Sequence, residues 1–189
     1  MENYRLEGKT FVIDDYDRLP AFSSFLPGLA GVKGIPMWTF YTNRGQGMNS
    51  FGIDNKGNAI MEFNSANTAF ENTTVKGFRT FLKIDGEYYE PFFKYEKEAK
   101  RQIRMNKNSF KIIETNEKYG IEVTVNYFIL PNESIGALVR QVSVKNISDS
   151  AKDIEVIDGL PKIITYGISN GEFKEMSNLF KSWAYIREH

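Results

Sequence analysis

The chain has 189 residues, with 24 basic and 24 acidic side chains and a formal net charge of +0. This balance provides no excess of positive charge to attract nucleic acid or an acidic membrane surface. There is no cysteine, and the single histidine, His189, is the last residue. Disulfides, thiolate nucleophiles, zinc–thiolate sites and histidine-based triads are therefore excluded by the inventory of side chains.

Phe and Tyr dominate an aromatic content of 14%, and a chain of this length can bury a core. Together with many Val, Ile and Thr residues, this composition favours β-strands, so we expect an all-β protein. The first residues contain no apolar signal core, and no apolar run reaches membrane-spanning length. We therefore expect a cytoplasmic protein.

The first predicted strand is Thr10–Ile13, and it is followed by a predicted loop, Phe22–Gly28, whose two aromatic side chains we expect to be buried. Gly28, Gly31 and Gly34 then recur at a spacing of three. One interpretation is a phosphate-binding loop, but neither of the established glycine-rich phosphate motifs is present. We favour a surface loop in which glycine lets one backbone approach another.

Residues 34–63 show the clearest hairpin pattern of the first half of the chain. Asn and Gly in its two turns supply the positive φ that tight hairpins require. Large side chains on both faces of the first strand predict a central strand that is covered on both sides. The predicted strands are Met37–Thr42, Met48–Ile53 and Ala59–Phe63, joined by turns at Asn43–Gly47 and Asp54–Asn58.

The middle of the chain is less regular. Asn64–Asn72 is small and amide-rich, with no predicted element, and Val75–Ile84 is predicted to be a strand with a bulge at Gly77. Asp85-Gly86 is a hairpin signal. The segment Tyr95–Asn108 mixes Lys, Arg and Glu, which is typical of a solvated face or loop.

Strict period-two alternation makes Ile121–Ile129 the strongest predicted strand, with one face apolar for nine residues. Successive strands on either side of it predict an antiparallel meander. The other strands are predicted at Phe110–Ile113, Ala137–Val144 and Asp153–Ile157.

Only the end of the chain is predicted to be helical, from Gly171 to His189. Its apolar residues recur at spacings of three and four, and Ser169 or Asn170 could cap its first turn. We expect it to dock one face on the strands. A membrane-surface helix is disfavoured because its polar face carries mixed charge. The apolar stripe consists of Phe173, Met176, Leu179, Phe180, Trp183 and Ile186, with Arg187 at the same spacing.

Residues 20–70, PAFSSFLPGLAGVKGIPMWTFYTNRGQGMNSFGIDNKGNAIMEFNSANTAF, resemble the start of the inverting oligosaccharide phosphorylases of glycoside hydrolase family 94. Within that family, which includes the cellobiose phosphorylases, they are most similar to the 1,2-β-oligoglucan phosphorylases. The later stretches GFRTF, EYYEPFF, VNYFILPNESIGALVRQVSVKN and DGLPKIITYG extend the resemblance over nearly the whole chain.

The resemblance implies a fold and a parent protein. The fold is an antiparallel β-super-sandwich of the galactose-mutarotase type, here with a C-terminal amphipathic helix over 171–189. Residues 1–189 would be a single, truncated N-terminal domain of a larger bacterial enzyme of carbohydrate metabolism, which continues into a helical linker, an (α/α)₆ barrel and a C-terminal β domain. The resemblance also implies a homodimer.

The reaction implied for the parent is attack of inorganic phosphate on the anomeric carbon of a β-glucan, with inversion. A carboxylic acid protonates the glycosidic oxygen, and the products are α-glucose 1-phosphate and a shortened glucan. In the family this acid is an Asp, and both it and the phosphate-binding residues lie in the barrel. No catalytic residue, cofactor or metal ligand can therefore be assigned to this chain, which we expect to be inactive alone.

Carboxylate-rich turns offer a local alternative for the catalytic acid. Asp14-Asp15-Tyr16-Asp17 and Glu87 with Glu90 are the main groups, and we expect them to be exposed and to lack a catalytic role.

Two functions remain open from the sequence. The chain could serve folding, dimer contact and one rim of the sugar cleft in a phosphorylase. It could instead be a freestanding carbohydrate-binding module, with Trp38, Tyr41, Tyr88 and Tyr89 as stacking platforms. Aromatic residues on alternating strands are more often part of a core.

Five polar residues are the candidates for contact with a sugar or a partner subunit. Guanidinium and amide groups make planar, directional hydrogen bonds that suit hydroxyl groups. For the arginine after Asn43, an ordinary role in the turn is an equally simple interpretation. The candidates are Arg44, Gln46, Asn64, Asn67 and Arg79.

Overall fold

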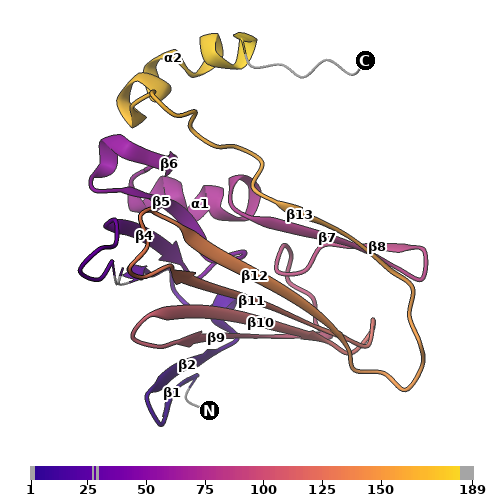
Figure 1. Ribbon diagram of the computed structural model, residues 1–189. Helices are drawn as coiled ribbons and strands as arrows, with labels where there is room; N and C mark the ends of the chain where they lie inside the picture. The colour runs from indigo at the N-terminus through magenta and orange to yellow at the C-terminus, as the bar shows by residue number, and fades with distance from the viewer. Residues whose placement is uncertain (1–2, 27, 29, 184–189) are drawn as a thin grey trace.

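The computed structural model describes residues 3–26, 28 and 30–183 (Figure 1). Most of the regular structure is β, and all strand pairs are antiparallel within three sheets, which confirms the all-β class. The strands are β1 (Tyr4–Glu7), β2 (Thr10–Asp14), β3 (Ser23–Leu26), β4 (Met37–Thr42), β5 (Met48–Ile53), β6 (Ala59–Met61), β7 (Arg79–Ile84), β8 (Glu87–Tyr89), β9 (Ala99–Met105), β10 (Ser109–Asn116), β11 (Ile121–Ile129), β12 (Leu138–Asn146) and β13 (Ile154–Gly159). The helices are α1 (Ala66–Lys76) and α2 (Asn170–Trp183), and short 3-10 turns occupy η1 (Tyr16–Arg18) and η2 (Lys56–Asn58).

The largest sheet has six strands in the order β1-β2-β9-β10-β11-β12. It contains the predicted strand β11, an interior strand between β10 and β12, in which every second side chain from Ile121 to Ile129 is buried and the intervening ones are half-buried. The alternation in the sequence of β11 therefore separates a core face from a solvent face.

Both smaller sheets lie on the core face of the large one (Figure 1). The four-stranded sheet, β3-β4-β5-β6, touches it where the rings of Tyr41 and Phe110 lie 4.4 Å apart. The three-stranded sheet, β13-β7-β8, contacts the turn between β10 and β11, where the rings of Tyr89 and Tyr119 lie 4.5 Å apart. The protein core is the apolar layer between them.

The predicted strands of residues 34–63 are confirmed as β4, β5 and β6, although β6 ends at Met61. Strand β4 carries aromatic groups on both faces. Tyr41 points to the large sheet, while the Phe40 ring lies 4.9 Å from that of Phe25 on the other face. The sequence predicted that side chains would cover both faces of this strand.

The prediction of a loop at Phe22–Gly28 with two buried aromatics is wrong in part. Residues Ser23–Leu26 form β3, which pairs with β4, and the Phe25 side chain is 55% exposed. Phe22 is half-buried and packs against the core. An antiparallel sheet can leave one face to solvent, so Phe25 needs no second layer above it.

Helix α1 was not predicted. It occupies Ala66–Lys76, so the strand expected from Val75 begins only at Arg79. Gly77 ends the helix and is not a bulge, because its N–H donates to the carbonyl of Thr73 at 3.1 Å. The segment is rich in Asn and Thr, which have low helix propensity, and packing of its buried face against the sheet stabilises it instead.

The prediction that Tyr95–Asn108 is a solvated face or loop is wrong in part, because only its ends are exposed and irregular. Its centre forms β9, an interior strand of the large sheet, with Ala99, Arg101 and Ile103 buried. The sequence does not show a period-two apolar pattern here, because the buried position between Ala99 and Ile103 is an arginine.

The meander extends through β12, but the last predicted strand leaves it. Strand β13 pairs with β7 in the three-stranded sheet, with Ile154 opposite Ile84. The crossing is fastened by Asp85, whose N–H donates to the carbonyl of Asp153 and whose Oδ1 accepts from its N–H, both at 2.9 Å. These bonds join segments 68 residues apart, so local sequence pattern cannot show them.

The C-terminal helix is confirmed from Asn170 to Trp183, with non-helical dihedral angles at Met176, and residues 184–189 lie outside the described part of the chain. Ser169 caps it: its Oγ accepts from the Glu172 N–H at 3.2 Å, and the Glu172 carboxylate accepts from the Ser169 N–H at 2.8 Å. The helix docks through its first turn, where Phe173 is buried against Ala59 and Ile164, whereas Met176 and Leu179 are exposed.

Gly47 provides a test of how tightly the turn after β4 is packed. It has φ +80°, and a Cβ atom added to it would lie 2.4 Å from the ring of the fully buried Phe110. We expect Gly47→Ala to lower the free energy of unfolding by about 2–4 kcal/mol, through backbone strain and overpacking. Urea unfolding measures this loss.

Gly86→Ala is the matched control. Gly86 has φ +90°, but nothing lies within 4 Å of its added Cβ. It should show only the cost of the positive φ, about 1 kcal/mol. Equal losses in the two variants would contradict the packing assigned to Gly47.

Candidate functional site

The five predicted residues lie in separate places and do not form one site. Arg44 and Asn67 are neighbours of Phe70, over whose ring the Arg44 guanidinium lies at 4.5 Å. The same guanidinium donates to the carbonyls of Asn43 at 2.7 Å and Leu19 at 2.9 Å, and its burial lowers the pKa of Arg44. Arg44 therefore fastens the loop after η1 to the turn after β4.

Asn67 is exposed and lines a shallow hollow beside Phe70 and residues 21–23. Of Arg44 and Asn67, it is Asn67 whose side chain faces solvent and is available to contact an external ligand. The Arg44 guanidinium is already hydrogen-bonded within the chain.

Gln46, in the turn between β4 and β5, belongs to a buried polar network that reaches strands of the other two sheets. Its Nε2 donates to Thr80 Oγ1 at 3.0 Å, and its Oε1 accepts from Arg140. Arg140 also donates to Asp158 and, at 3.2 Å, to the hydroxyl of Tyr127. This network ties the turn after β4, β7, β11, β12 and β13 together, which is a structural role.

Arg79 forms a two-pronged ion pair with Glu90, with N–O distances of 2.6 and 2.7 Å. Its guanidinium also lies 4.7 Å from the centre of the Phe81 ring.

The expectation that the carboxylate-rich turns are exposed is wrong for Glu90 and for Asp17, because both are half-buried in ion pairs. Engagement with arginine leaves neither free as a general acid.

The buried ion pairs around Glu114 were not predicted. Glu114 accepts from Arg101 Nε at 2.6 Å, from the N–H of Phe92 at 2.7 Å and from the hydroxyl of Tyr89. Arg101 also pairs with Asp17 at 2.7 Å. Burial, followed by the nearby Glu114, raises the pKa of Tyr89 well above its usual range. Every charge here has a partner, so the network fixes the loop before β9 and offers no free acid or base.

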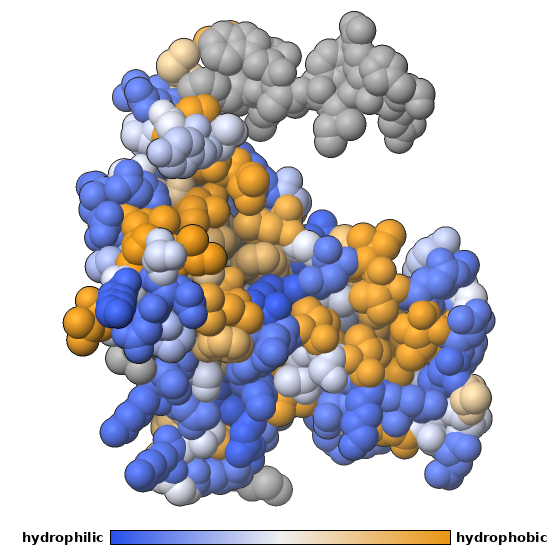
Figure 2. Space-filling model, viewed as in Figure 1, coloured by the Kyte–Doolittle hydropathy of each residue, from blue (hydrophilic) through white to orange (hydrophobic). Residues whose placement is uncertain are grey.

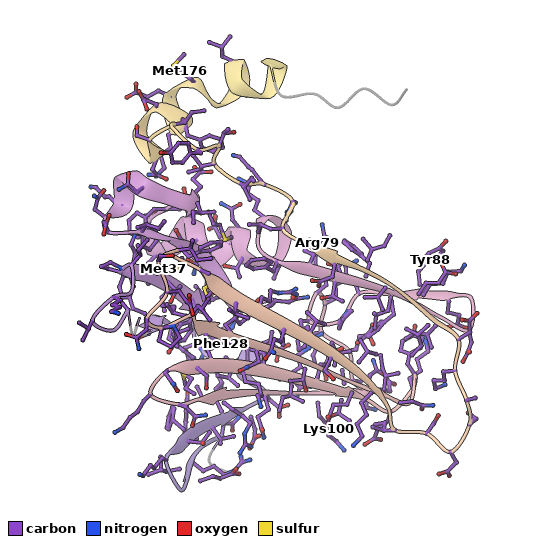
Figure 3. All side chains as sticks on the ribbon, viewed as in Figure 1. Met37, Arg79, Tyr88, Lys100, Phe128 and Met176 are labelled. Carbon is purple, nitrogen blue, oxygen red and sulfur yellow. The ribbon has the colours of Figure 1, made fainter. Side chains whose placement is uncertain are left out.

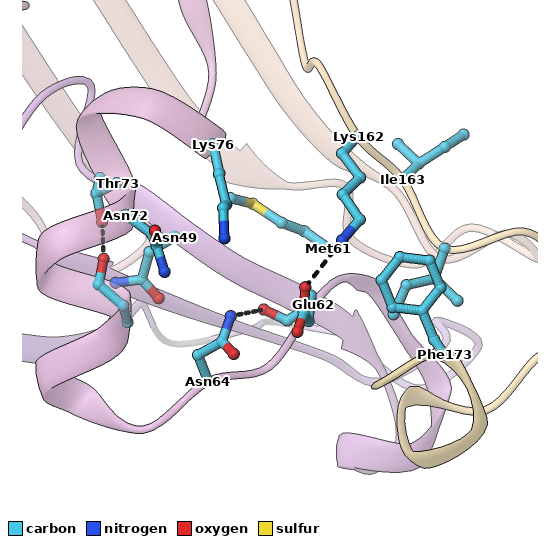
Figure 4. A pocket seen from close by; sticks show the side chains of 12 residues that line it. Asn49, Met61, Glu62, Asn64, Asn72, Thr73, Lys76, Lys162, Ile163 and Phe173 are labelled. Carbon is cyan, nitrogen blue, oxygen red and sulfur yellow. Dashed lines mark hydrogen bonds and ion pairs between the residues drawn. The ribbon is translucent and has the colours of Figure 1, made fainter. Parts of the chain in front are cut away.

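Asn64 lies in a different place, at a pocket between α1, the β5–β6 pair and the segment 160–173 (Figure 4). Its amide donates to the carbonyl of Glu62 at 3.4 Å. The pocket has a free volume of about 20 Å³, which suits one water-sized group. The lining residues are Asn49, Met61, Glu62, Asn64, Ala69, Asn72, Thr73, Lys76, Lys162, Ile163, Ile164 and Phe173.

Asn49 of β5 is the unusual residue of this pocket. Its side chain is 5% exposed, and neither its Nδ2 nor its Oδ1 has a hydrogen-bond partner among the described residues. Buried amides are normally paired, so this one marks a place where a bound group would be favourable. The sequence signal was an asparagine within the mostly apolar strand Met48–Ile53.

Comparisons of the chain with protein-family models and with curated proteins found no match.

The four aromatic residues considered as stacking platforms do not form a common surface. Tyr41 and Tyr89 are buried, and Trp38 is half-buried with its Nε1 donating to the carbonyl of Asn55 at 3.0 Å. Tyr88 alone among the four is exposed, at 82%, and it projects from the far end of the three-stranded sheet (Figure 3).

In the described part of the chain, no group of three or more His, Cys, Asp or Glu side chains could hold a metal ion. No helix within those residues is long and apolar enough to cross a membrane.

Proposed function

We propose that this chain is the N-terminal β-super-sandwich, of the galactose-mutarotase type, of a cytoplasmic inverting carbohydrate phosphorylase of glycoside hydrolase family 94. The resemblance of residues 20–70 and of the later stretches to that family carries the proposal. Antiparallel sheets packed in two layers are compatible with such a domain. The domain would act in folding, in a homodimer contact and at one rim of the sugar cleft.

The observation that best supports a scaffold role is the engagement of the predicted contact residues inside the chain. Arg44 holds backbone carbonyls, Gln46 joins a network across the sheets, and Arg79 is paired with Glu90. Side chains used in this way position strands and loops. The acid and the phosphate pocket of the reaction would belong to the barrel of the parent.

A surface for the rest of the parent or for a second copy is available at β12 and β13. Each strand is at the edge of its sheet, and apolar surface gathers in their region (Figure 2). Val156 and Ile157 of β13 are both exposed, the latter at 73%. Free edges with apolar side chains are usually covered in a complete protein.

The alternative, a freestanding carbohydrate-binding module, has less support. Such a module needs exposed aromatic rings in a row, and three of the four candidates are buried or half-buried. The scaffold role therefore remains the stronger proposal.

An activity assay tests this proposal. The purified chain, incubated with phosphate and β-1,2- or β-1,4-linked glucans, should release no glucose 1-phosphate, because in the proposed parent the general acid belongs to the barrel. The full-length parent, encoded by a reading frame that continues after His189 into a helical barrel, should release it. Glucose 1-phosphate release by the chain alone, lost on substitution of one of its carboxylates, would overturn the assignment.

A further inference from the structure

The pocket at Asn49 contains unsatisfied hydrogen-bonding capacity that the scaffold role does not use. The Asn49 amide is buried at its inner end, with no partner for its two N–H donors or its carbonyl oxygen among the described residues. Burying an amide without partners is costly, and the cost is recovered when a bound group makes the missing hydrogen bonds.

We propose that this pocket binds a hydroxyl group of a polyol, with a monosaccharide unit as the class of ligand. An amide presents both donors and an acceptor, and a hydroxyl is the small group that can both accept and donate. The free volume of about 20 Å³ admits one such group next to Asn49. The remainder of the sugar ring would then lie at the mouth of the pocket.

The mouth has the mixed polarity that further hydroxyls require. Lys76, exposed at the end of α1, makes no hydrogen bond or ion pair with any described residue, and it points toward the same space as Asn49 (Figure 4). Asn64 adds an amide, and the pair of Lys162 with Glu62, at 3.3 Å, adds both a donor and an acceptor. These groups come from α1, from the end of β6 and from the C-terminal segment.

Apolar side chains complete the site. Ile164 and Phe173 form a wall from the C-terminal segment, and Met61 forms part of the base. Sugar rings present C–H groups as well as hydroxyls, so binding sites for them combine apolar walls with a few directional polar groups. A small oxyanion fits less well, because it brings no hydrogen-bond donor and the Asn49 carbonyl oxygen would stay unpaired.

The test follows the Asn49 side-chain amide by ¹⁵N-edited NMR while D-glucose is added to the labelled chain. A saturable shift of this amide is expected with D-glucose. Tetrahydropyran has the same ring without hydroxyls and should cause no shift, and inorganic phosphate should cause none either. Response to tetrahydropyran alone, to phosphate alone, or to none of these probes, as when the pocket holds a bound water only, would overturn the proposal.

Variants test whether glucose binding depends on the residues that line the pocket. Asn49→Leu, which removes the polar atoms at similar size, should weaken glucose binding at least about tenfold, followed through neighbouring backbone amides. Lys76→Met should weaken it about threefold, and this exposed change leaves the core intact. Glu71→Gln changes an exposed residue of the same helix that does not line the pocket, and this variant should bind as the unchanged chain does.

Equal affinity in Asn49→Leu and in the unchanged chain would refute the site. The measurement needs no phosphorolysis, so it succeeds or fails independently of the proposed phosphorylase. A folded chain that binds glucose but belongs to no phosphorylase would leave this inference standing.

Discussion

Replacing Glu114 with alanine is expected to lower the free energy of unfolding by about 3–5 kcal/mol, because it leaves a buried arginine without its nearest counter-charge. Glu114 is 1% exposed and pairs with Arg101 at 2.6 Å. It also accepts from the N–H of Phe92, a non-glycine residue held at φ +65°. The variant therefore loses a charge pair and the hydrogen bond that stabilises a strained backbone. Urea unfolding followed by circular dichroism measures the loss.

Two further variants identify the cause. Glu114→Gln keeps a hydrogen-bond acceptor but not the charge, so its loss should be intermediate. Glu117→Ala removes the exposed partner of Lys100, which lies at 2.6 Å, and should leave the unfolding midpoint unchanged. A Glu114→Ala midpoint indistinguishable from that of Glu117→Ala would show that the buried network does not stabilise the fold.

Alkaline pH is expected to unfold the protein cooperatively through three buried tyrosines, Tyr16, Tyr89 and Tyr127. Burial raises the pKa of each above its ordinary value of 10.0, and it raises the pKa of Tyr127 to about 12 although Arg140 opposes the shift. The unfolded chain releases these protons near pH 10, whereas the folded chain retains them to higher pH. Stability is therefore complete below about pH 10 and falls as the pH rises toward the folded pKa values.

Between about pH 10 and 12, the free energy of unfolding is expected to fall by about 1.4 kcal/mol per pH unit for each such tyrosine. For the three together the slope is about 4 kcal/mol per pH unit. Urea unfolding at a series of pH values gives the slope, and tyrosinate absorbance reports ionisation. Tyr127→Phe should reduce the slope by about one third, whereas Tyr88→Phe, on an exposed residue, should not change it. A stability that is flat across this range would contradict the burial of these hydroxyls.

Sequence pattern alone was sufficient where a strand shows strict apolar–polar alternation or is bounded by clear turn signals. The period-two alternation of Ile121–Ile129 predicted β11, and the turn signals around Met37–Thr42 and Met48–Ile53 predicted β4 and β5. These elements are encoded by local hydrophobic periodicity and by residues that tolerate positive φ. The capping pair of Ser169 and Glu172 is equally local, which is why the start of α2 could be predicted.

The candidate sites depended on partners far apart in the chain. Gln46 and Arg79 were predicted to contact a sugar or a partner subunit, but Arg140 and Glu90, from other parts of the chain, bind them instead. The unpaired amide of Asn49 was equally invisible, because only the docking of α1 and the C-terminal segment encloses it.

Partners far apart in the chain also explain why β9, α1 and the pairing of β13 were not predicted. The sequence of β9 is typical of a charged surface, but in the fold Arg101 is buried in an ion pair with Glu114 on the neighbouring strand. The sequence of β13 is typical of the last strand of a meander, but in the fold this strand pairs with β7 and is held there by Asp85. Helix α1 has weak intrinsic propensity and forms because Ala69 and Thr73 bury against the sheet. Local periodicity and turn residues thus determined β4, β5 and β11, while buried charge pairing and long-range packing, which only the tertiary structure supplies, decided β9, β13 and α1.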